Sequence, residues 1–282
     1  MDAAAGVDDP GVTPRRPLIL LTIAGSDSGG GAGIQADLPT FAAHGAYGLS
    51  ALTAVTAQDT LAVHAVQTLP PELVAAQIDA AFGDIGVDGV KIGMLGSAEV
   101  ARAVAERLAF HLAGRPIPVV LDPVLVASSG RALLDADALP ILLDRLLPLA
   151  TVVTPNLPEL ERLTGLPATD EPSRLAAARA LARRGPAVLA KGGHAPGDEI
   201  VDLLVAGQEI HRFRSARLAT RAGHGTGCTL SAALAARLAA GEPLATAAES
   251  AIEYVRRAIL AAPGLGCGRG PLGHPPASLL TQ

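Results

Sequence analysis

The residues best suited to chemistry lie in a glycine-rich stretch at 221–231, which reads RAGHGTGCTLS and runs into an alanine- and leucine-rich segment at 232–240. The glycines predict a turn, and the segment after them has high helix propensity. Free N–H groups and the dipole at a helix N-terminus favour an anion there and lower the pKa of a thiol. Cys228, one of two cysteines, lies in this turn. The stretch predicts either an anion site with a reactive thiol or a helix cap with a structural cysteine.

Three further polar residues follow apolar runs that read as strands. Asp122 ends the run 118–121, where a carboxylate is costly unless it is paired or near a metal ion. Asn156 and Glu159 follow the run 151–153 and are one helical turn apart. They are suited to holding hydrated Mg²⁺ near phosphates, and equally to an N-terminal capping box.

Lysine is rare in this chain, because only Lys91 and Lys191 occur among 22 basic residues. Each lies in a glycine-containing loop after an apolar run, which indicates positions where an ammonium group is required. We expect Lys191 to contact phosphate. Two histidines beside glycine loops, His194 and His224, are expected to be solvent-exposed loop residues.

A second glycine-rich loop, at 25–33, follows the first predicted strand. It lacks the lysine of a Walker A motif. It matches a loosened dinucleotide fingerprint, but no acidic residue follows at the ribose position before Asp59, so a nicotinamide cofactor is a poor interpretation. Asp27 and Asp37 either contact a ligand or cap a turn and a helix, and their spacing favours capping.

Apolar runs alternate with helical segments along the chain and predict an α/β fold whose mostly parallel sheet is covered on both faces. Ligand-binding residues then belong in loops at the C-terminal ends of the strands. Strands are expected at 18–24, 48–57, 63–69, 89–92, 118–121, 151–153, 187–190, 199–205 and 209–213. Helices are expected at 34–44, 71–82, 97–109, within 137–147, after 156, and at 173–183, 232–240 and 243–261.

Composition narrows the function further. The 282 residues carry a net charge of −5, which argues against nucleic acid or an anionic membrane as the main partner. No apolar run is long enough to cross a bilayer, and the first 17 residues are no secretory signal. Two cysteines form no disulfide framework, which favours the cytoplasm. We expect a disordered leader at 1–16, one domain at 17–275 and a flexible tail at 276–282.

Five blocks in unbroken order resemble the hydroxymethylpyrimidine/phosphomethylpyrimidine kinases of thiamine biosynthesis, members of the ribokinase-like superfamily. The blocks are LTIAGSDSGGGAGIQAD at 21–37, KIGML at 91–95, TPNLPE at 154–159, KGGH at 191–194 and HGTGCTLS at 224–231. The resemblance implies a three-layer α/β/α sandwich, ATP with Mg²⁺, a small pyrimidine substrate and a homodimer. It also implies two phosphorylations, first of the hydroxymethyl group and then of the resulting monophosphate.

The resemblance also implies roles for individual residues. The pyrimidine pocket would be lined by Gly25, Asp37, Gln58 and Met94. The Mg²⁺ and ATP phosphates would be served by Asp122, Asn156, Glu159, Lys191 and Thr226, and the anion hole and catalytic centre by Gly225, Thr226, Gly227, Cys228 and Lys191. Cys228 is expected to accept the proton of the substrate hydroxyl.

One position departs from the pattern, because Ser128 stands where the family commonly has lysine before a Ser-Gly pair. If that lysine holds the second phosphate, the second step would be weaker here. A pyridoxine/pyridoxal kinase shares the scaffold and a hydroxymethyl acceptor, and Gln58 and Met94 only weakly favour the aminopyrimidine. A non-catalytic nucleotide- or pyrimidine-binding protein is the remaining alternative.

Overall fold

The computed structural model describes residues 16–125, 135 and 137–276 of the chain. Residues 1–15 of the expected leader, residues 277–282 of the expected tail and Ser128 lie outside these described residues. None of the helices in the described ranges is long and apolar enough to cross a membrane.

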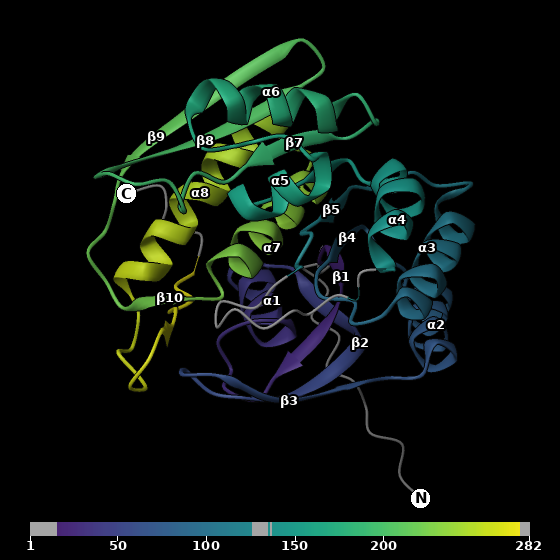
Figure 1. Ribbon diagram of the computed structural model, residues 1–282. Helices are drawn as coiled ribbons and strands as arrows, with labels where there is room; N and C mark the ends of the chain where they lie inside the picture. The colour runs from purple at the N-terminus through teal and green to yellow at the C-terminus, as the bar shows by residue number, and fades with distance from the viewer. Residues whose placement is uncertain (1–15, 126–134, 136, 277–282) are drawn as a thin grey trace, which may run out of the picture.

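A nine-stranded sheet in the order β3-β2-β1-β4-β5-β6-β7-β8-β9 forms the centre of the molecule (Figure 1). Six adjacent strands are parallel to one another, in the order β2, β1, β4, β5, β6 and β7. Strand β3 pairs antiparallel at one edge of the sheet, and β8 and β9 pair antiparallel at the other. The strands are β1 Ile19–Asp27, β2 Tyr47–Gln58, β3 Val63–Thr68, β4 Gly89–Ile92, β5 Val119–Leu121, β6 Val152–Val153, β7 Ala187–Ala190, β8 Glu199–Ala206 and β9 Glu209–Ala216.

Helices cover both faces of the sheet. One layer contains α1 Ile34–Ala43, α7 Thr226–Ala239 and α8 Leu244–Leu260, and the other contains α2 Pro71–Ala80, α3 Ala98–Leu112, α4 Ala138–Ile141, α5 Leu157–Thr164 and α6 Glu171–Ala182. Short π- or 3₁₀-helical turns occur at Ala81–Ile85, Leu142–Leu146 and Leu147–Leu149.

Alternation along the strands explains the two layers. In β5, Val119 and Leu121 pack into the core beneath α2–α6, whereas Val120 packs into the core beneath α1, α7 and α8. Successive strand residues point to opposite faces, so a strand that is apolar throughout is buried on both sides. The predicted three-layer α/β/α sandwich with a mostly parallel sheet is therefore confirmed.

Local sequence fixes several helix starts. The side chain of Ser97 accepts a hydrogen bond of 3.3 Å from the Val100 N–H and caps α3, at the start of the helix expected at 97–109. Proline occupies the first turn of α2, where its missing N–H costs nothing. The strands expected at 199–205 and 209–213 are confirmed as β8 and β9, which pair antiparallel as a hairpin.

Three features differ from the expectation. Strand β1 continues past Ala24 to Asp27, because the backbone shifts register beside β2 instead of leaving the sheet. Helix α7 begins at Thr226, so 226–231 are helical and Cys228 lies in the first turn. The short strands β10 Ala222–His224 and β11 Gly270–Pro271 pair with each other in segments that lack apolar alternation.

Candidate active site

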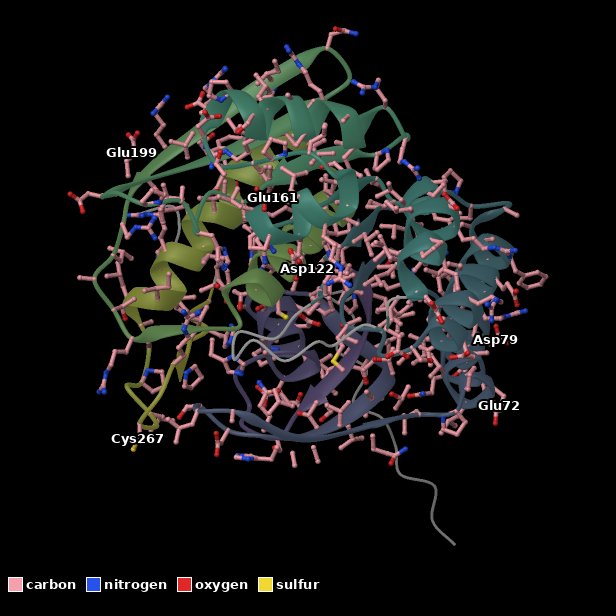
Figure 2. All side chains as sticks on the ribbon, viewed as in Figure 1. Glu72, Asp79, Asp122, Glu161, Glu199 and Cys267 are labelled. Atoms are coloured by element: carbon pink, nitrogen blue, oxygen red, sulfur yellow. The ribbon has the colours of Figure 1, made fainter. Side chains whose placement is uncertain are left out.

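The polar loops converge at one edge of the sheet. Five parallel strands, β1, β4, β5, β6 and β7, end there, and the residues at or just after their C-terminal ends are Asp27, Met94, Asp122, Asn156 and Lys191. Figure 2 shows Asp122 near the middle of the molecule, close to the start of α7. The expectation that these loops share one edge is confirmed.

Lys191 lies against the N-terminus of α7. Its Nζ is 2.9 Å from Oδ1 of Asp122 and 4.0 Å from Oε2 of Glu159. A Cβ atom placed on Gly227 would lie 3.1 Å from the same nitrogen. Burial opposes the ammonium charge, but the carboxylates of Asp122 and Glu159 favour it, and the pKa of Lys191 is raised. A permanent cation therefore adjoins free N–H groups of a helix, which is an anion-binding arrangement.

Asn156 and Glu159 form the predicted capping box of α5. The Asn156 side chain accepts a hydrogen bond from the Glu159 N–H at 3.0 Å, and Glu159 Oε2 accepts one from the Asn156 N–H at 2.8 Å. Burial raises the pKa of Glu159 to about 7, against the opposing effect of Lys191. The described residues contain no group of three or more His, Cys, Asp or Glu side chains that could hold a metal ion.

Gly225 joins the two glycine-rich loops. Its φ of +84° is a left-handed conformation that favours glycine, and it serves as the N-cap of α7. A Cβ atom at Gly225 would collide with the carbonyl oxygen of Gly31. The loop at 25–33 and the start of α7 are thus in direct backbone contact.

Asp27 and His224 strengthen this junction. Oδ2 of Asp27 lies 2.7 Å from Nε2 of His224, and the carboxylate also accepts N–H bonds from Gly29, Gly31 and Ala32. Burial would raise the pKa of Asp27, but the hydrogen bonds from His224 and Gly29 hold it below its usual value. The turn-capping prediction for Asp27 is confirmed. The expectation of an exposed His224 is wrong, because it is only 6% exposed; His194 is exposed, as expected.

Cys228 does not have the lowered pKa that its position at a helix N-terminus predicts. Burial raises the pKa of its thiol to about 11, although the ammonium of Lys91 opposes the shift. Loss of solvation therefore outweighs the helix dipole and the nearby cation, and the negative charges of Asp37 and Asp122 add to it. The residues around Cys228 indicate the helix dipole, whereas the burial of the thiol depends on the folded structure.

A buried ion pair lies behind Cys228. Lys91 Nζ is 2.8 Å from Oδ2 of Asp37, and both side chains are fully buried. Thr22 Oγ1 donates a 2.6 Å bond to the same oxygen, which leaves Asp37 Oδ1 without a hydrogen-bond partner among the described residues. Asp37 does not cap α1, contrary to its spacing, because Gly33 occupies the N-cap. The rarity of lysine identified Lys91, but nothing in the sequence indicated its partner.

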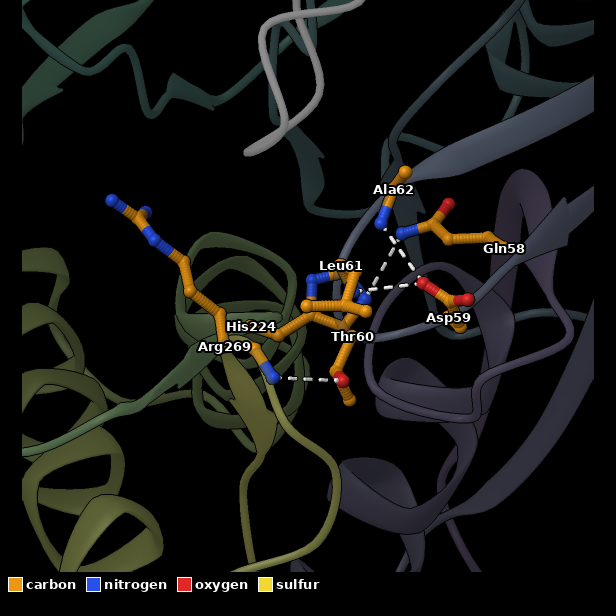
Figure 3. Close-up of a pocket in the computed structure, with 8 residues that line it drawn as sticks. Gln58, Asp59, Thr60, Leu61, Ala62, His224 and Arg269 are labelled. Atoms are coloured by element: carbon orange, nitrogen blue, oxygen red, sulfur yellow. Dashed lines mark hydrogen bonds between the residues drawn. The ribbon is translucent and has the colours of Figure 1, made fainter.

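Two of the expected pyrimidine-pocket residues adjoin each other, and a third lies beside His224. Gly25 lies against Met94, whose Sδ is 3.1 Å from an ideal Cβ position on the glycine. The Gln58 amide nitrogen lies 3.1 Å from Nε2 of His224. Figure 3 shows Gln58 and His224 at the wall of a cavity of about 210 Å³. The pyrimidine-binding roles remain predictions.

Comparison with known proteins gives the site its context. The family model for phosphomethylpyrimidine kinase matches residues 27–273. A hydroxymethylpyrimidine/phosphomethylpyrimidine kinase of Rhizobium meliloti (strain 1021) is 52% identical over 260 residues, covering 91% of this chain and 96% of that protein. The thiamine biosynthesis bifunctional protein ThiED of Geobacter sulfurreducens is 51% identical over 90% of this chain, which spans 52% of that protein.

Solved structures agree with the fold. A Bacillus subtilis pyridoxal kinase in complex with ADP matches with a TM-score of 0.84 and 34% sequence identity, covering 93% of this chain and 99% of that one. The ribokinase-like fold implied by the resemblance is thereby confirmed. Since the family model covers β2 to β11, most of the loop at 25–33 and the whole of α7, this chain belongs to the phosphomethylpyrimidine kinase family.

Proposed function

We propose that this chain uses ATP to phosphorylate 4-amino-5-hydroxymethyl-2-methylpyrimidine and then phosphorylates the monophosphate to the diphosphate, in thiamine biosynthesis. Relatives about 50% identical to this chain, which are named as hydroxymethylpyrimidine/phosphomethylpyrimidine kinase and as a thiamine biosynthesis protein, support the activity. The observation that carries the proposal is the position of the Lys191 ammonium beside Gly227, in the first turn of α7. The N–H groups at 225–228 and this cation together suit the charge of a transferring phosphoryl group.

In the first step, the hydroxymethyl oxygen attacks the γ-phosphorus of ATP. A new P–O bond forms, the bond to the bridging oxygen breaks, and ADP leaves. The proton of the hydroxyl passes to the thiolate of Cys228. Thr226 and Lys191 contact the ATP phosphates, while Asp37, Gln58 and Met94 hold the ring.

The raised pKa of Cys228 has two opposite effects on this role. At neutral pH only a small fraction of the thiol is ionised, because its pKa is about 11. The thiolate is, however, a stronger base toward an alcohol than one with a lower pKa would be. The positive charge of the buried Lys91 ammonium lowers the pKa of Cys228, against the effect of burial, and so favours formation of the thiolate. The rate of the first step should then follow the thiolate fraction.

The oxygen donors at the site suit Mg²⁺ bound mainly by ATP. Asp122 and Glu159 both face Lys191, whereas the amide oxygen of Asn156 is engaged in the capping box. We infer that these three residues act on the ion partly through water, as Mg²⁺ with few protein ligands requires. When bound, Mg²⁺ neutralises charge on the phosphates.

A pyridoxal kinase activity is the second candidate, supported by the structural similarity to the Bacillus subtilis pyridoxal kinase. Its acceptor is also a hydroxymethyl group on a heteroaromatic ring. The higher identity to pyrimidine kinases, 52% against 34%, places it second.

Replacement of the proposed base tests the mechanism. Cys228→Ala should lower kcat of the first step by roughly 10²–10⁴-fold, the range for loss of a general base. The matched control is Cys267→Ala, because Cys267 is the other cysteine and is exposed. Near-normal kcat in Cys228→Ala, with an unchanged unfolding curve, would show that another group accepts the proton.

We further infer that the enzyme works in the cytoplasm as a homodimer. The two described cysteines are free, which is consistent with a reducing compartment, and the family resemblance supports the dimer. Light scattering of the purified chain should give twice the monomer mass of 28.3 kDa; a monomer would contradict the dimer.

A further inference from the structure

A cavity of about 210 Å³ adjoins the active site, and of its lining residues the proposed first phosphorylation uses Gln58 alone. Its walls come from the turn between β2 and β3, from His224 and from the segment before β11 (Figure 3). The lining residues are Gln58, Asp59, Thr60, Leu61, Ala62, His224, Gly268 and Arg269. His224, which lines the cavity, directly precedes Gly225, the N-cap of α7.

The backbone of the cavity wall is fixed by two hydrogen bonds. The Arg269 N–H donates to the carbonyl oxygen of Thr60 at 3.0 Å, and the Gly268 N–H donates to Thr60 Oγ1 at 3.2 Å. A Cβ atom on Gly268 would collide with the Thr60 carbonyl oxygen, so the backbones of the two segments are in close contact. The position of Arg269 is therefore set by the fold, while its side chain is exposed.

The guanidinium of Arg269 is available to bind an anion. Among the residues that the structure describes, Arg269 has no acidic partner, whereas the neighbouring Asp59 pairs with His64 at 2.8 Å. Figure 3 shows the Arg269 side chain extending away from Thr60. Burial lowers the pKa of His194, and the positive charges of Lys191, Arg269 and Arg217 lower it further.

The two acceptors of the proposed function differ in length and charge. The first is a neutral hydroxymethyl group that must lose a proton. The second is a phosphate monoester, whose second pKa of about 6 makes it largely dianionic at pH 7. To reach the same γ-phosphorus, the longer monophosphate must bind with its ring displaced outward, and its charge repels the ATP phosphates. The second substrate therefore requires extra space and an extra cation.

We propose that the cavity and Arg269 form the binding site specific to the monophosphate substrate, with the guanidinium paired to its phosphate. This inference rests on the proposed function. In the second step an oxygen of that phosphate attacks the γ-phosphorus, a P–O–P bond forms, the bond from the γ-phosphorus to the bridging oxygen breaks, and ADP leaves. No proton needs to be removed, so the second step depends on Arg269 and is independent of a base at Cys228.

Arg269→Gln tests this division with both acceptors in the full-length enzyme. We expect kcat/KM for the monophosphate to fall about tenfold or more, as for loss of a charge-assisted hydrogen bond, with the value for the hydroxymethyl substrate within about twofold of wild type. Arg269→Lys should retain part of the second activity, since it keeps the charge. Arg145→Gln removes an exposed cation in the turn at Leu142–Leu146, which does not line the cavity, and serves as the matched control.

Cys228→Ala should show the reverse pattern, with a large loss in the first step and a smaller one in the second. Equal losses for both acceptors in Arg269→Gln, or a raised KM for ATP in both steps, would overturn the inference and assign Arg269 to the nucleotide. Unchanged kinetics with the monophosphate would overturn it as well. A wild-type enzyme that phosphorylates neither pyrimidine would instead refute the proposed function.

Discussion

Gly225 lies directly against the carbonyl oxygen of Gly31, so that no side chain fits between them. Gly225→Ala should force the two loops apart and strain a residue held at φ +84°. We expect kcat of the first step to fall at least about 100-fold, because a misplacement of about 1 Å has that effect. Gly223→Ala is the matched control, since nothing lies within 4 Å of its ideal Cβ position. Equal kinetics for the two variants would contradict this account of the junction.

The buried pair of Lys91 and Asp37 should dominate the stability of the site. Lys91→Met leaves the Asp37 carboxylate buried without its cation and should lower the free energy of unfolding by about 3–5 kcal/mol. The double variant Lys91→Met/Asp37→Leu should recover much of that loss, because it removes both charges. Urea unfolding of the three proteins measures the difference. If Lys91→Met lowered the free energy of unfolding by less than about 1 kcal/mol, the ion pair would not be needed for the stability of the fold.

Lys191 is predicted to act on the phosphates of ATP. Lys191→Met should lower kcat by roughly 10²–10³-fold, as for loss of one group that stabilises transition-state charge. Lys191→Arg should not restore full activity, because the guanidinium is larger and the space beside Gly227 is narrow. Steady-state kinetics with ATP varied makes the measurement. If kcat and the KM for ATP were both unchanged, Lys191 would have no contact with the nucleotide.

The pH dependence of the first step follows from the raised pKa of Cys228. A base must be deprotonated to act, and the folded thiol has a pKa of about 11. Below that value kcat/KM should therefore rise about tenfold per pH unit through the neutral range. In Cys228→Ala this slope should disappear while the residual rate persists. A plateau in the wild-type enzyme near neutral pH would instead indicate a base of much lower pKa.

Much of the fold could be predicted from the sequence. The strands of the parallel core are apolar throughout, and glycine, proline and capping residues such as Ser97 mark the helix ends. These signals are local, so they can be found without knowing the fold. The pairing of β10 with β11 could not be predicted, because two-residue strands have no periodicity and depend on tertiary contact.

The loops that form the site could be predicted from the sequence, but most of the contacts between their side chains could not. Strand order places Asp122 and Lys191 at one edge, which the alternation of strands and helices already indicated. The pKa of Cys228 and the burial of His224 depend on what packs around them. Burial, which raises the pKa of Cys228, depends on the folded molecule. The sequence around Cys228 indicates only the helix dipole, which would lower that pKa.

The most direct test of the central claim is ADP formation by the purified full-length chain with three acceptors compared under one condition. The acceptors are hydroxymethylpyrimidine, its monophosphate and pyridoxal, each with ATP and Mg²⁺. We predict ADP formation with both pyrimidine compounds, with a higher kcat/KM for each than for pyridoxal. Activity on pyridoxal alone would contradict the proposed function.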